Sequence, residues 1–197
     1  QDTGTEPISD VDEDGFSTED GDCDDTDPEV HPDAEDIRGD GIDSNCDTED
    51  GVAPNYPPSD GILVCSEEEL NTAIAAAMPG DDIVMCDGVW NDIIIDFAVT
   101  GTEEEPIILW AETPGSVTLE GQSRLRLSGE YAWVSGLVMM NGYSEDHVPA
   151  VDFRGNTSAT GICHNCRLTN FAIVAWNPAS ADTYYWWILM RGTNNRI

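Results

Sequence analysis

The spacing of apolar residues divides the chain into a polar first part and a largely apolar second part. From position 62 onward, short apolar stretches are separated by Gly, Pro and Asn. One series of stretches recurs at intervals of 21 to 28 residues, beginning at Ile62, Ile83, Ile107, Ala132, Thr160 and Trp186. Two or three short strands in each period of about 25 residues are typical of a solenoid made of parallel β-strands.

Two further series of apolar stretches lie between the first. One begins at Ile93, Val117, Leu137, Arg167 and Asn195, and a weaker one at Leu125 and Val151. A β-sandwich is the alternative, but it would need tight hairpin turns between its strands. Asn141-Gly142 is the one Asn-Gly dipeptide in this region. We therefore predict an all-β fold, a parallel β-helix that occupies residues 61–197.

A single α-helix is predicted at the start of the β-helix. Ser66 and Glu69 have the spacing of a capping box, and Pro79-Gly80 provides a stop. Between them, apolar residues follow helical spacing at Leu70, Ala73, Ile74 and Ala77. The first coil of a solenoid needs a cover, so we expect the helix Glu67–Met78 to cap the N-terminal end.

The first part of the chain is too poor in large apolar residues to bury a core. Twenty-two of the 40 acidic residues lie within the first 60 positions. We divide this part into a polar lead-in at 1–9, an acidic module at 10–50 and a linker at 51–60 with three prolines. Such a module folds only if a bound metal and a disulfide replace the missing hydrophobic contribution.

The acidic residues of the module have the spacing of calcium ligands. Asp10, Asp12 and Asp14 alternate before Gly15, so their side chains can converge while the glycine permits a sharp turn. The carbonyl of Phe16 is expected to join them, with Asp22 or Asp25 completing the site. A second site is expected from Asp24, Asp27, Asp40, Asp43, Asn45 and Asp47. We expect two or more Ca²⁺ ions; the alternative is a solvated acidic run.

The six cysteines indicate disulfides formed in an oxidising compartment. Local pairing favours Cys23–Cys46, Cys65–Cys86 and Cys163–Cys166, one of 15 possible connectivities. A redox role for the Cys163–Cys166 pair and zinc binding by thiolates are less favoured alternatives. No apolar run is long enough to span a membrane, and no leader opens the chain, which suggests a mature secreted form.

The formal charge of −33 excludes a nucleic-acid surface, and an anionic polysaccharide would be repelled unless calcium bridged the two. All seven basic residues are arginines, and lysine is absent. Arg124 and Arg126 share one face of a strand, where they could meet a carboxylated sugar or pair with Glu120 or Glu130. The aromatic run 184–187 could stack on sugar rings, but core packing is the favoured interpretation.

Two family resemblances arise from these motifs. The phrases DVDEDG, DCDDTDPEVHPDAED and DGIDSNCD resemble the metal-binding repeat of the MopE type, which implies a secreted calcium-binding module with Cys23 paired to Cys46. Residues 62–197 resemble the N-terminal part of polysaccharide lyase family 6, the alginate lyases and chondroitinase B. The sequence segments that carry this second resemblance are AAAMPGDDIVMCDGVWND, GTEEEPIILWAETPGSVTLEG, LRLSGEYAWVSGLVMMNGY and RGTNNRI.

The second resemblance implies a right-handed parallel β-helix and β-elimination on uronate polysaccharides. That family uses a lysine base, an arginine and a calcium ion held by Asn and Glu, on coils beyond the NNRI phrase. Because this chain has no lysine, we name no catalytic residue.

Three functions remain open at this point. The chain can be the N-terminal part of a secreted, calcium-dependent polyuronate lyase that lacks the catalytic coils. It can instead be a complete extracellular structural or filament subunit that assembles through an open β-helix end. A degenerate carbohydrate-binding module is the third.

Overall fold

The computed structural model describes residues 10–34, 42–46, 48, 57–155, 161–177, 180 and 182–197. Its contacts form two compact units, Gln1–Pro54 and Asn55–Ile197. The described residues of the first unit form turns and loops without a helix or strand. The second unit contains the strands and the single helix of the described chain.

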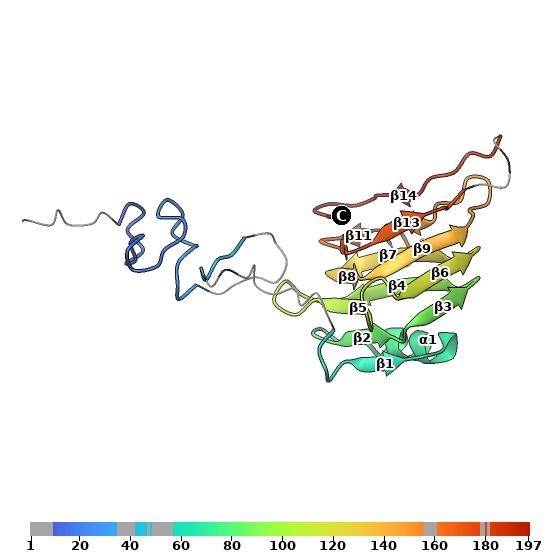
Figure 1. Ribbon diagram of the computed structural model, residues 1–197, viewed down its shortest axis with the longest axis horizontal. Helices are drawn as coiled ribbons and strands as arrows, with labels where there is room; N and C mark the ends of the chain where they lie inside the picture. Colours follow the sequence, from blue (N-terminus) through green and yellow to red (C-terminus); the bar gives the residue numbers. More distant parts are fainter. Residues whose placement is uncertain are drawn as a thin grey trace, which may run out of the picture. The chain divides into compact units, whose positions relative to one another are not determined.

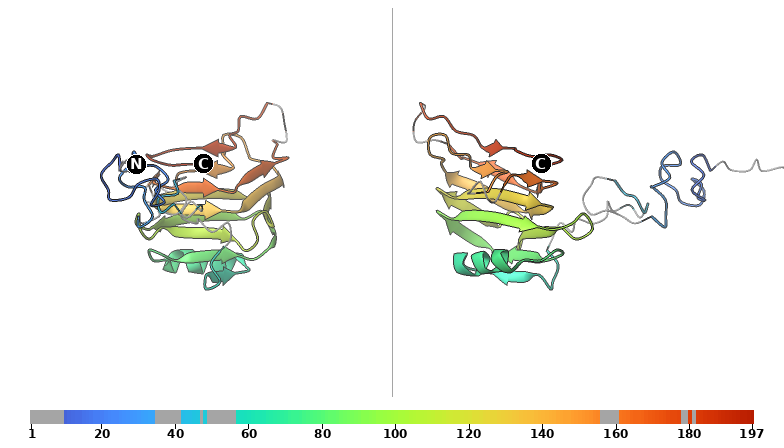
Figure 2. Two further views of the ribbon diagram at one scale, coloured as in Figure 1. Left: turned by 60° about the vertical axis from the view of Figure 1, so that its left-hand side comes forward. Right: turned by 180° about the vertical axis from the view of Figure 1, so that it is seen from behind.

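The second unit is a parallel β-helix with three sheets along its length (Figures 1 and 2). The first sheet consists of β1 (Ile62–Val64), β2 (Asp82–Met85), β5 (Ile107–Ala111), β8 (Ala132–Ser135) and β12 (Arg167–Thr169). The second consists of β3 (Gly88–Asn91), β6 (Val117–Gly121), β9 (Leu137–Gly142) and β13 (Ala172–Val174). Neighbouring strands within each sheet are parallel, as the β-helix requires.

The third sheet is the least regular. It contains β4 (Ile94–Thr100), β7 (Arg124–Glu130), β10 (Val151–Asp152), β11 (Cys163–His164) and β14 (Ile188–Leu189). Both β10 and β11 pair with β7, one at its start and one at its end. An antiparallel bridge between Arg154 and Ile162 closes the excursion that separates them.

The strands stack in register, so the same kind of side chain recurs at the same place in each coil. Ile83 pairs with Leu109, Leu109 with Val134 and Val134 with Leu168. All four are at most 1% exposed. Burying one such side chain contributes about 2 kcal/mol, and this column is repeated in the other two sheets.

The helix α1 (Glu67–Ala76) lies on the first coil, where it contacts β1, β2 and β4. Ser66 caps it by accepting a hydrogen bond from the Glu69 N–H, while Glu69 Oε2 accepts one from the Cys65 N–H. The helix ends at Ala76 rather than the predicted Met78, because the Met78 N–H donates to Asp81 Oδ2 at 2.8 Å. The predicted helical cap and the predicted β-helix are confirmed.

The predicted strand series is correct for its first four members and fails beyond them. Ile62, Ile83, Ile107 and Ala132 begin strands of the first sheet, or in the case of Ile83 lie at the second position of one. The next strand of that sheet begins at Arg167, whereas Trp186 precedes a strand of the third sheet. Thr160 lies outside the described residues. Loops at the corners of the coils lengthen the interval between successive strands of one sheet, while the strands still pair in register.

The close stacking of coils makes one glycine especially sensitive to substitution. Gly129 has a φ of +98°, and a Cβ there would overlap the carbonyl oxygen of Val99 in the coil below. We expect Gly129→Ala to lower the free energy of unfolding of the β-helix by more than about 3 kcal/mol.

Gly115 is the matched control, because its φ of +85° is similarly unfavourable while nothing lies within 4 Å of an added Cβ. We expect Gly115→Ala to cost about 1 kcal/mol, from backbone strain alone. Chemical denaturation followed by far-UV circular dichroism measures both variants. An equal loss of unfolding free energy in the two variants would show that contact between coils is not what makes Gly129 sensitive.

Candidate metal centre

Hydrogen bonds from its own backbone hold the loop of residues 10–16 in a turn around its aspartates. Asp10 accepts from the N–H groups of Glu13 and Gly15, at 2.7 and 3.0 Å. Asp14 Oδ1 accepts from the Phe16 N–H at 2.7 Å. Gly15 has a φ of +105°, a conformation that glycine adopts without strain. The alternating aspartates before a glycine therefore form a compact loop, as their spacing indicates.

The next segment contributes two more carboxylates to this loop. Asp25 Oδ1 accepts from the Val11 N–H at 3.1 Å, and Asp22 Oδ1 accepts from the Asp24 N–H at 2.9 Å. Cys23, between them, forms a disulfide with Cys46. This disulfide joins the segment to residues 42–46 and restricts where Asp22 and Asp25 can lie.

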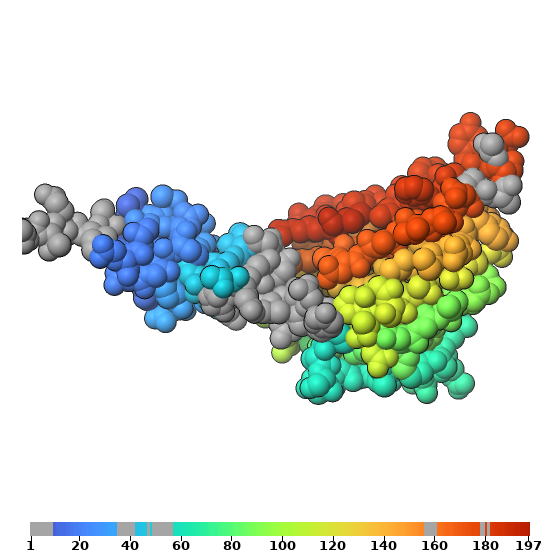
Figure 3. Space-filling view, in the orientation of Figure 1, coloured from blue at the N-terminus to red at the C-terminus, as the bar shows by residue number. Residues whose placement is uncertain are grey.

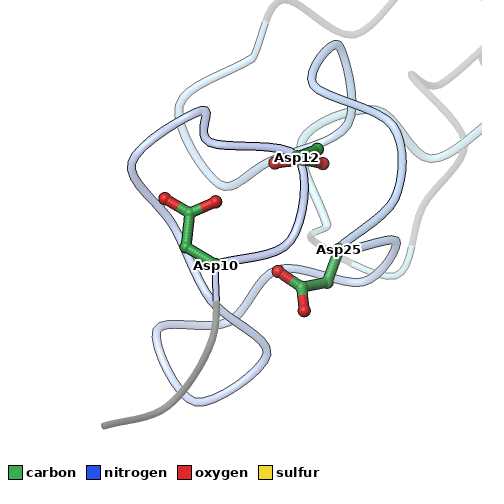
Figure 4. Close-up of side chains that lie close together, drawn as sticks. All are labelled: Asp10, Asp12 and Asp25. Atoms are coloured by element: carbon green, nitrogen blue, oxygen red, sulfur yellow. The ribbon is translucent and has the colours of Figure 1, made fainter.

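The carboxylates meet in two overlapping groups. One contains Asp10, Asp12 and Asp25, and the other Asp12, Asp14 and Asp22; in each, one oxygen per residue lies within 4.8 Å of the others. Figure 4 shows the first group, in which Asp10 and Asp12 belong to the loop of residues 10–16 and Asp25 to the next segment. Asp12 belongs to both groups and is their common member.

Three oxygen atoms in the second group are buried without a hydrogen-bond partner. They are Oδ2 of Asp12, Asp14 and Asp22, and Asp22 as a whole is only 5% exposed. A buried carboxylate oxygen without a partner is costly, and several together repel one another. A divalent cation among them would supply the missing partner. The residues present therefore fit a hard metal ion.

Burial raises the pKa of Asp12, and neighbouring carboxylates raise it further, although the Asp14 N–H bond acts in the opposite direction. A folded-state pKa above the unfolded one means that the metal-free module loses stability as the pH rises above the usual value of 3.8. A bound cation reverses this dependence, because it favours the ionised carboxylate.

The predicted second site stays a prediction, because two of its six residues lie outside the described part of the chain and the other four belong to neither carboxylate group. Asp24 Oδ1 accepts from the Thr26 hydroxyl, Asp27 Oδ1 from the Glu29 N–H, and Asp43 Oδ2 from the Thr48 N–H. Asn45 also has an interaction partner. Asp40 and Asp47 lie outside the described residues. Asp22 and Asp25, expected as alternatives in the first site, each join a different group.

An aromatic contact joins the end of this loop to the segment around His31. The rings of Phe16 and His31 stack with centroids 5.0 Å apart, and His31 Nδ1 is buried without a hydrogen-bond partner. The spacing of residues along the chain gives no signal for this contact between His31 and Phe16. A role for the Phe16 carbonyl in metal binding stays a prediction.

The other two disulfides lie in the β-helix. Cys65–Cys86 joins the segments that follow β1 and β2, and Cys163–Cys166 closes a short turn before β12. With Cys23–Cys46 they form the pairing that the sequence favoured. No described helix is long and apolar enough to cross a membrane.

Comparisons with known proteins agree with both units. The profile of the family described as chondroitinase B matches residues 64–197, and one of the MopE type, described as "Putative metal-binding motif", matches residues 22–50. A comparison with curated proteins found no match. The fold and the first match define a polysaccharide lyase-like β-helix. The chain belongs to the chondroitinase B family.

Solved structures similar to the chain are lyases of family PL6. The alginate lyase AlyGC is 40% identical with a TM-score of 0.54, over 57% of this chain and 15% of that chain. The polysaccharide lyase Pedsa3628 from Pseudopedobacter saltans is 36% identical with a TM-score of 0.60, over 68% and 29%. A mannuronic acid specific lyase from human gut microbiota is 27% identical with a TM-score of 0.60, over 70% and 32%. This chain thus spans between 15% and 32% of their lengths.

The shared position of Asp12 leads to a testable difference between acidic residues. We expect Asp12→Asn to weaken metal binding at least about tenfold, because it removes a ligand from both groups. Glu19→Gln removes an equal charge from an exposed residue outside the groups, and should change affinity less than about twofold. Isothermal titration of the metal-free protein measures both. Equal losses would indicate general charge attraction rather than a defined site.

Proposed function

We propose that the first unit is a calcium-binding module whose two carboxylate groups each hold one ion. The two groups consist of carboxylate oxygens, which are the ligands that Ca²⁺ prefers. Copper favours imidazole and sulfur ligands, and neither kind of ligand belongs to either group. The buried, unpartnered oxygens of Asp12, Asp14 and Asp22 are the observation that carries this proposal.

The absence of an ordinary core in this unit supports a structural role for the ion. Val30 is the one buried apolar side chain among its described residues, alongside the buried polar residues Ser17, Asp22 and Ser44. A single valine cannot offset the entropy of ordering the roughly 30 described residues of this unit, at roughly 1 kcal/mol or more for each. Ion binding and the Cys23–Cys46 disulfide would supply the difference.

Removal of calcium should therefore unfold the first unit and spare the second. We expect a chelator to abolish amide-exchange protection within 10–34 and 42–46 while the β-strands keep theirs, because the strands rely on apolar burial. Hydrogen exchange with mass spectrometry, on protein with intact disulfides, measures both regions at once.

Restoring calcium should return the protection, and magnesium or copper at equal concentration should not. Protection of 10–34 that survives the chelator would contradict a structural calcium site, and recovery with copper alone would assign the site to that metal.

For the second unit, we propose that it is part of a secreted lyase that acts on a polyuronate. Family membership, together with 40% identity to an alginate lyase, supports this substrate class. Three disulfides within 197 residues support an extracellular location. The coils present here would serve as scaffold, since β-elimination needs a base to remove the proton next to the carboxylate.

Assembly through the end of the β-helix stays a sequence-based prediction that no contact in the described chain tests.

The carbohydrate-binding alternative gains support from an exposed aromatic cluster on the second unit, where sequence reasoning favoured core packing. Tyr184, Trp186 and Trp187 are 72%, 41% and 49% exposed, so core packing is wrong for these three.

The division between scaffold and catalytic coils can be tested with the chain itself. We expect the 197-residue chain to release no unsaturated uronate from alginate, because it contains no lysine to act as the base. Ultraviolet absorbance during incubation with calcium detects that product. A steady increase in absorbance would contradict the assignment and would place a base within these coils. A complete alginate lyase of the same family is the positive control.

A further inference from the structure

The Cys23–Cys46 disulfide lies next to a ligand of each carboxylate group in the first unit. Asp22 directly precedes Cys23 and belongs to one group, and Asp25 lies two positions after it and belongs to the other. Both groups therefore take one carboxylate from residues 22–25, the stretch that the disulfide anchors. The geometry of either group depends on where this stretch is held.

Hydrogen bonds accompany the disulfide and join the same two segments. The Cys23 N–H donates to Cys46 Sγ at 3.1 Å, and Cys23 Sγ lies 3.5 Å from the carbonyl oxygen of Asp43. The His31 N–H donates to the Ser44 carbonyl at 2.9 Å, and Ser44 is only 8% exposed. These short contacts require the two segments to stay together, which the covalent bond ensures.

The disulfide supplies a large part of the order of this unit, because apolar burial is scarce. It joins residues 10–34 to residues 42–46, which lie side by side in Figure 3, and Val30 is the one buried apolar side chain in these two segments. Cys23 and Cys46 are 23 positions apart, and a crosslink that closes a loop of this length raises the folded-to-unfolded ratio by about two orders of magnitude. Reduction of the bond removes one of the few contributions that favour the folded unit.

Metal binding and folding of this unit are coupled, because the ligands converge only in the folded state. Asp22 is 5% exposed, and its Oδ2 is buried without a hydrogen-bond partner, so the ion-free unit carries the cost of like charges brought together. The apparent affinity for an ion that binds only the folded unit falls in proportion to the folded fraction. A loss of folded population on reduction therefore becomes a loss of affinity.

We propose that calcium binding by the first unit is coupled to the oxidation state of Cys23–Cys46, so that the oxidised chain binds the ion tightly and the reduced chain binds it weakly. The inference rests on the calcium-binding function proposed above and adds its regulation. Because coupling between two equilibria is reciprocal, bound calcium makes the disulfide harder to reduce by the same factor. The unit gains its calcium affinity only in a compartment where disulfides form.

The Cys23–Cys46 bond is accessible to a thiol reductant. Cys23 is exposed and Cys46 is partly exposed, whereas Cys163 and Cys166 are both 0% exposed. A dithiol reagent supplies the two electrons and two protons of the reduction. Its thiolate attacks one protein sulfur, the bond between Cys23 and Cys46 breaks, two protein thiols form, and the reagent is left as its own disulfide.

The direct test is the calcium affinity of the full chain, measured by isothermal titration for the oxidised protein and for Cys23→Ser/Cys46→Ser. The serine pair removes the bond without leaving thiols that bind other metals. We expect it to bind calcium at least about tenfold more weakly. Cys65→Ser/Cys86→Ser is the matched control, because it opens a loop of similar length in the second unit, and it should change the affinity less than about twofold.

The reciprocal test measures the reduction of each disulfide in the unaltered chain, equilibrated with dithiothreitol buffers that contain calcium or a chelator. Mass spectrometry after alkylation identifies the reduced cysteines. We expect calcium to move the midpoint of Cys23–Cys46 by at least about 30 mV toward more reducing conditions, which corresponds to a tenfold change in the equilibrium constant. Cys65–Cys86, in the same molecule, should show no shift.

Each outcome decides the proposal. If the oxidised chain and its Cys23→Ser/Cys46→Ser variant bind calcium equally well, the coupling is wrong while the calcium-binding function stands. If the oxidised chain binds no calcium, both are wrong. An equal shift of both disulfides would show a general effect of the ion and would overturn the coupling. At saturating calcium the variant should regain amide-exchange protection within 10–34, because its carboxylates are unchanged, and failure to regain it would also overturn the coupling.

Discussion

Electrostatic repulsion between carboxylates is the constraint on which the first unit depends. Asp10, Asp12, Asp14, Asp22 and Asp25 lie within two overlapping groups, in a unit whose described residues include a single buried valine. Without a counter-charge, folding would bring like charges together and bury some of them, and few apolar contacts would offset the cost. Divalent ions invert this balance, because the same convergence of oxygens becomes their coordination shell. In the proposed calcium-bound state, the acidic residues of the segment would thus stabilise its fold rather than oppose it.

The second unit is stabilised in a different way. Parallel coils place apolar residues over apolar residues, as in the column that contains Ile83 and Leu109, and the helix α1 covers the first coil. Polar contacts between coils add to this; Trp110 Nε1, for example, donates to Asp82 Oδ1 at 2.6 Å. Neither the apolar stacking nor these hydrogen bonds between coils depend on a bound ion. In the function proposed above, one chain therefore combines a unit that would respond to calcium with one that should not.

Sequence reasoning predicted the β-helix because its period is set by local geometry, and the capping helix because Ser66 and Glu69 have a recognisable spacing. The period was lost after Ala132, where the loop before β10 and the excursion between β10 and β11 add residues of no fixed number. For the metal site, spacing along the chain indicated Asp10, Asp12 and Asp14. It could not decide between Asp22 and Asp25, because a long-range position depends on the Cys23–Cys46 disulfide and the turn it closes.

The aromatic run 184–187 shows the limit of alternation as a guide. Alternation predicts which side of a strand a residue occupies only where a strand exists, and residues 184–187 precede β14 rather than lie in it. Three of the four are exposed, and the rings of Tyr184 and Trp186 lie against His147, which is far away in sequence.

The number of ions bound per chain tests the central claim most directly. Native mass spectrometry of the disulfide-intact protein, dialysed against calcium and then against ammonium acetate, counts them. The account predicts a main species that carries two calcium ions, and a loss of both in Asp12→Asn. A main species with the mass of the polypeptide alone, with the first unit still folded, would contradict it.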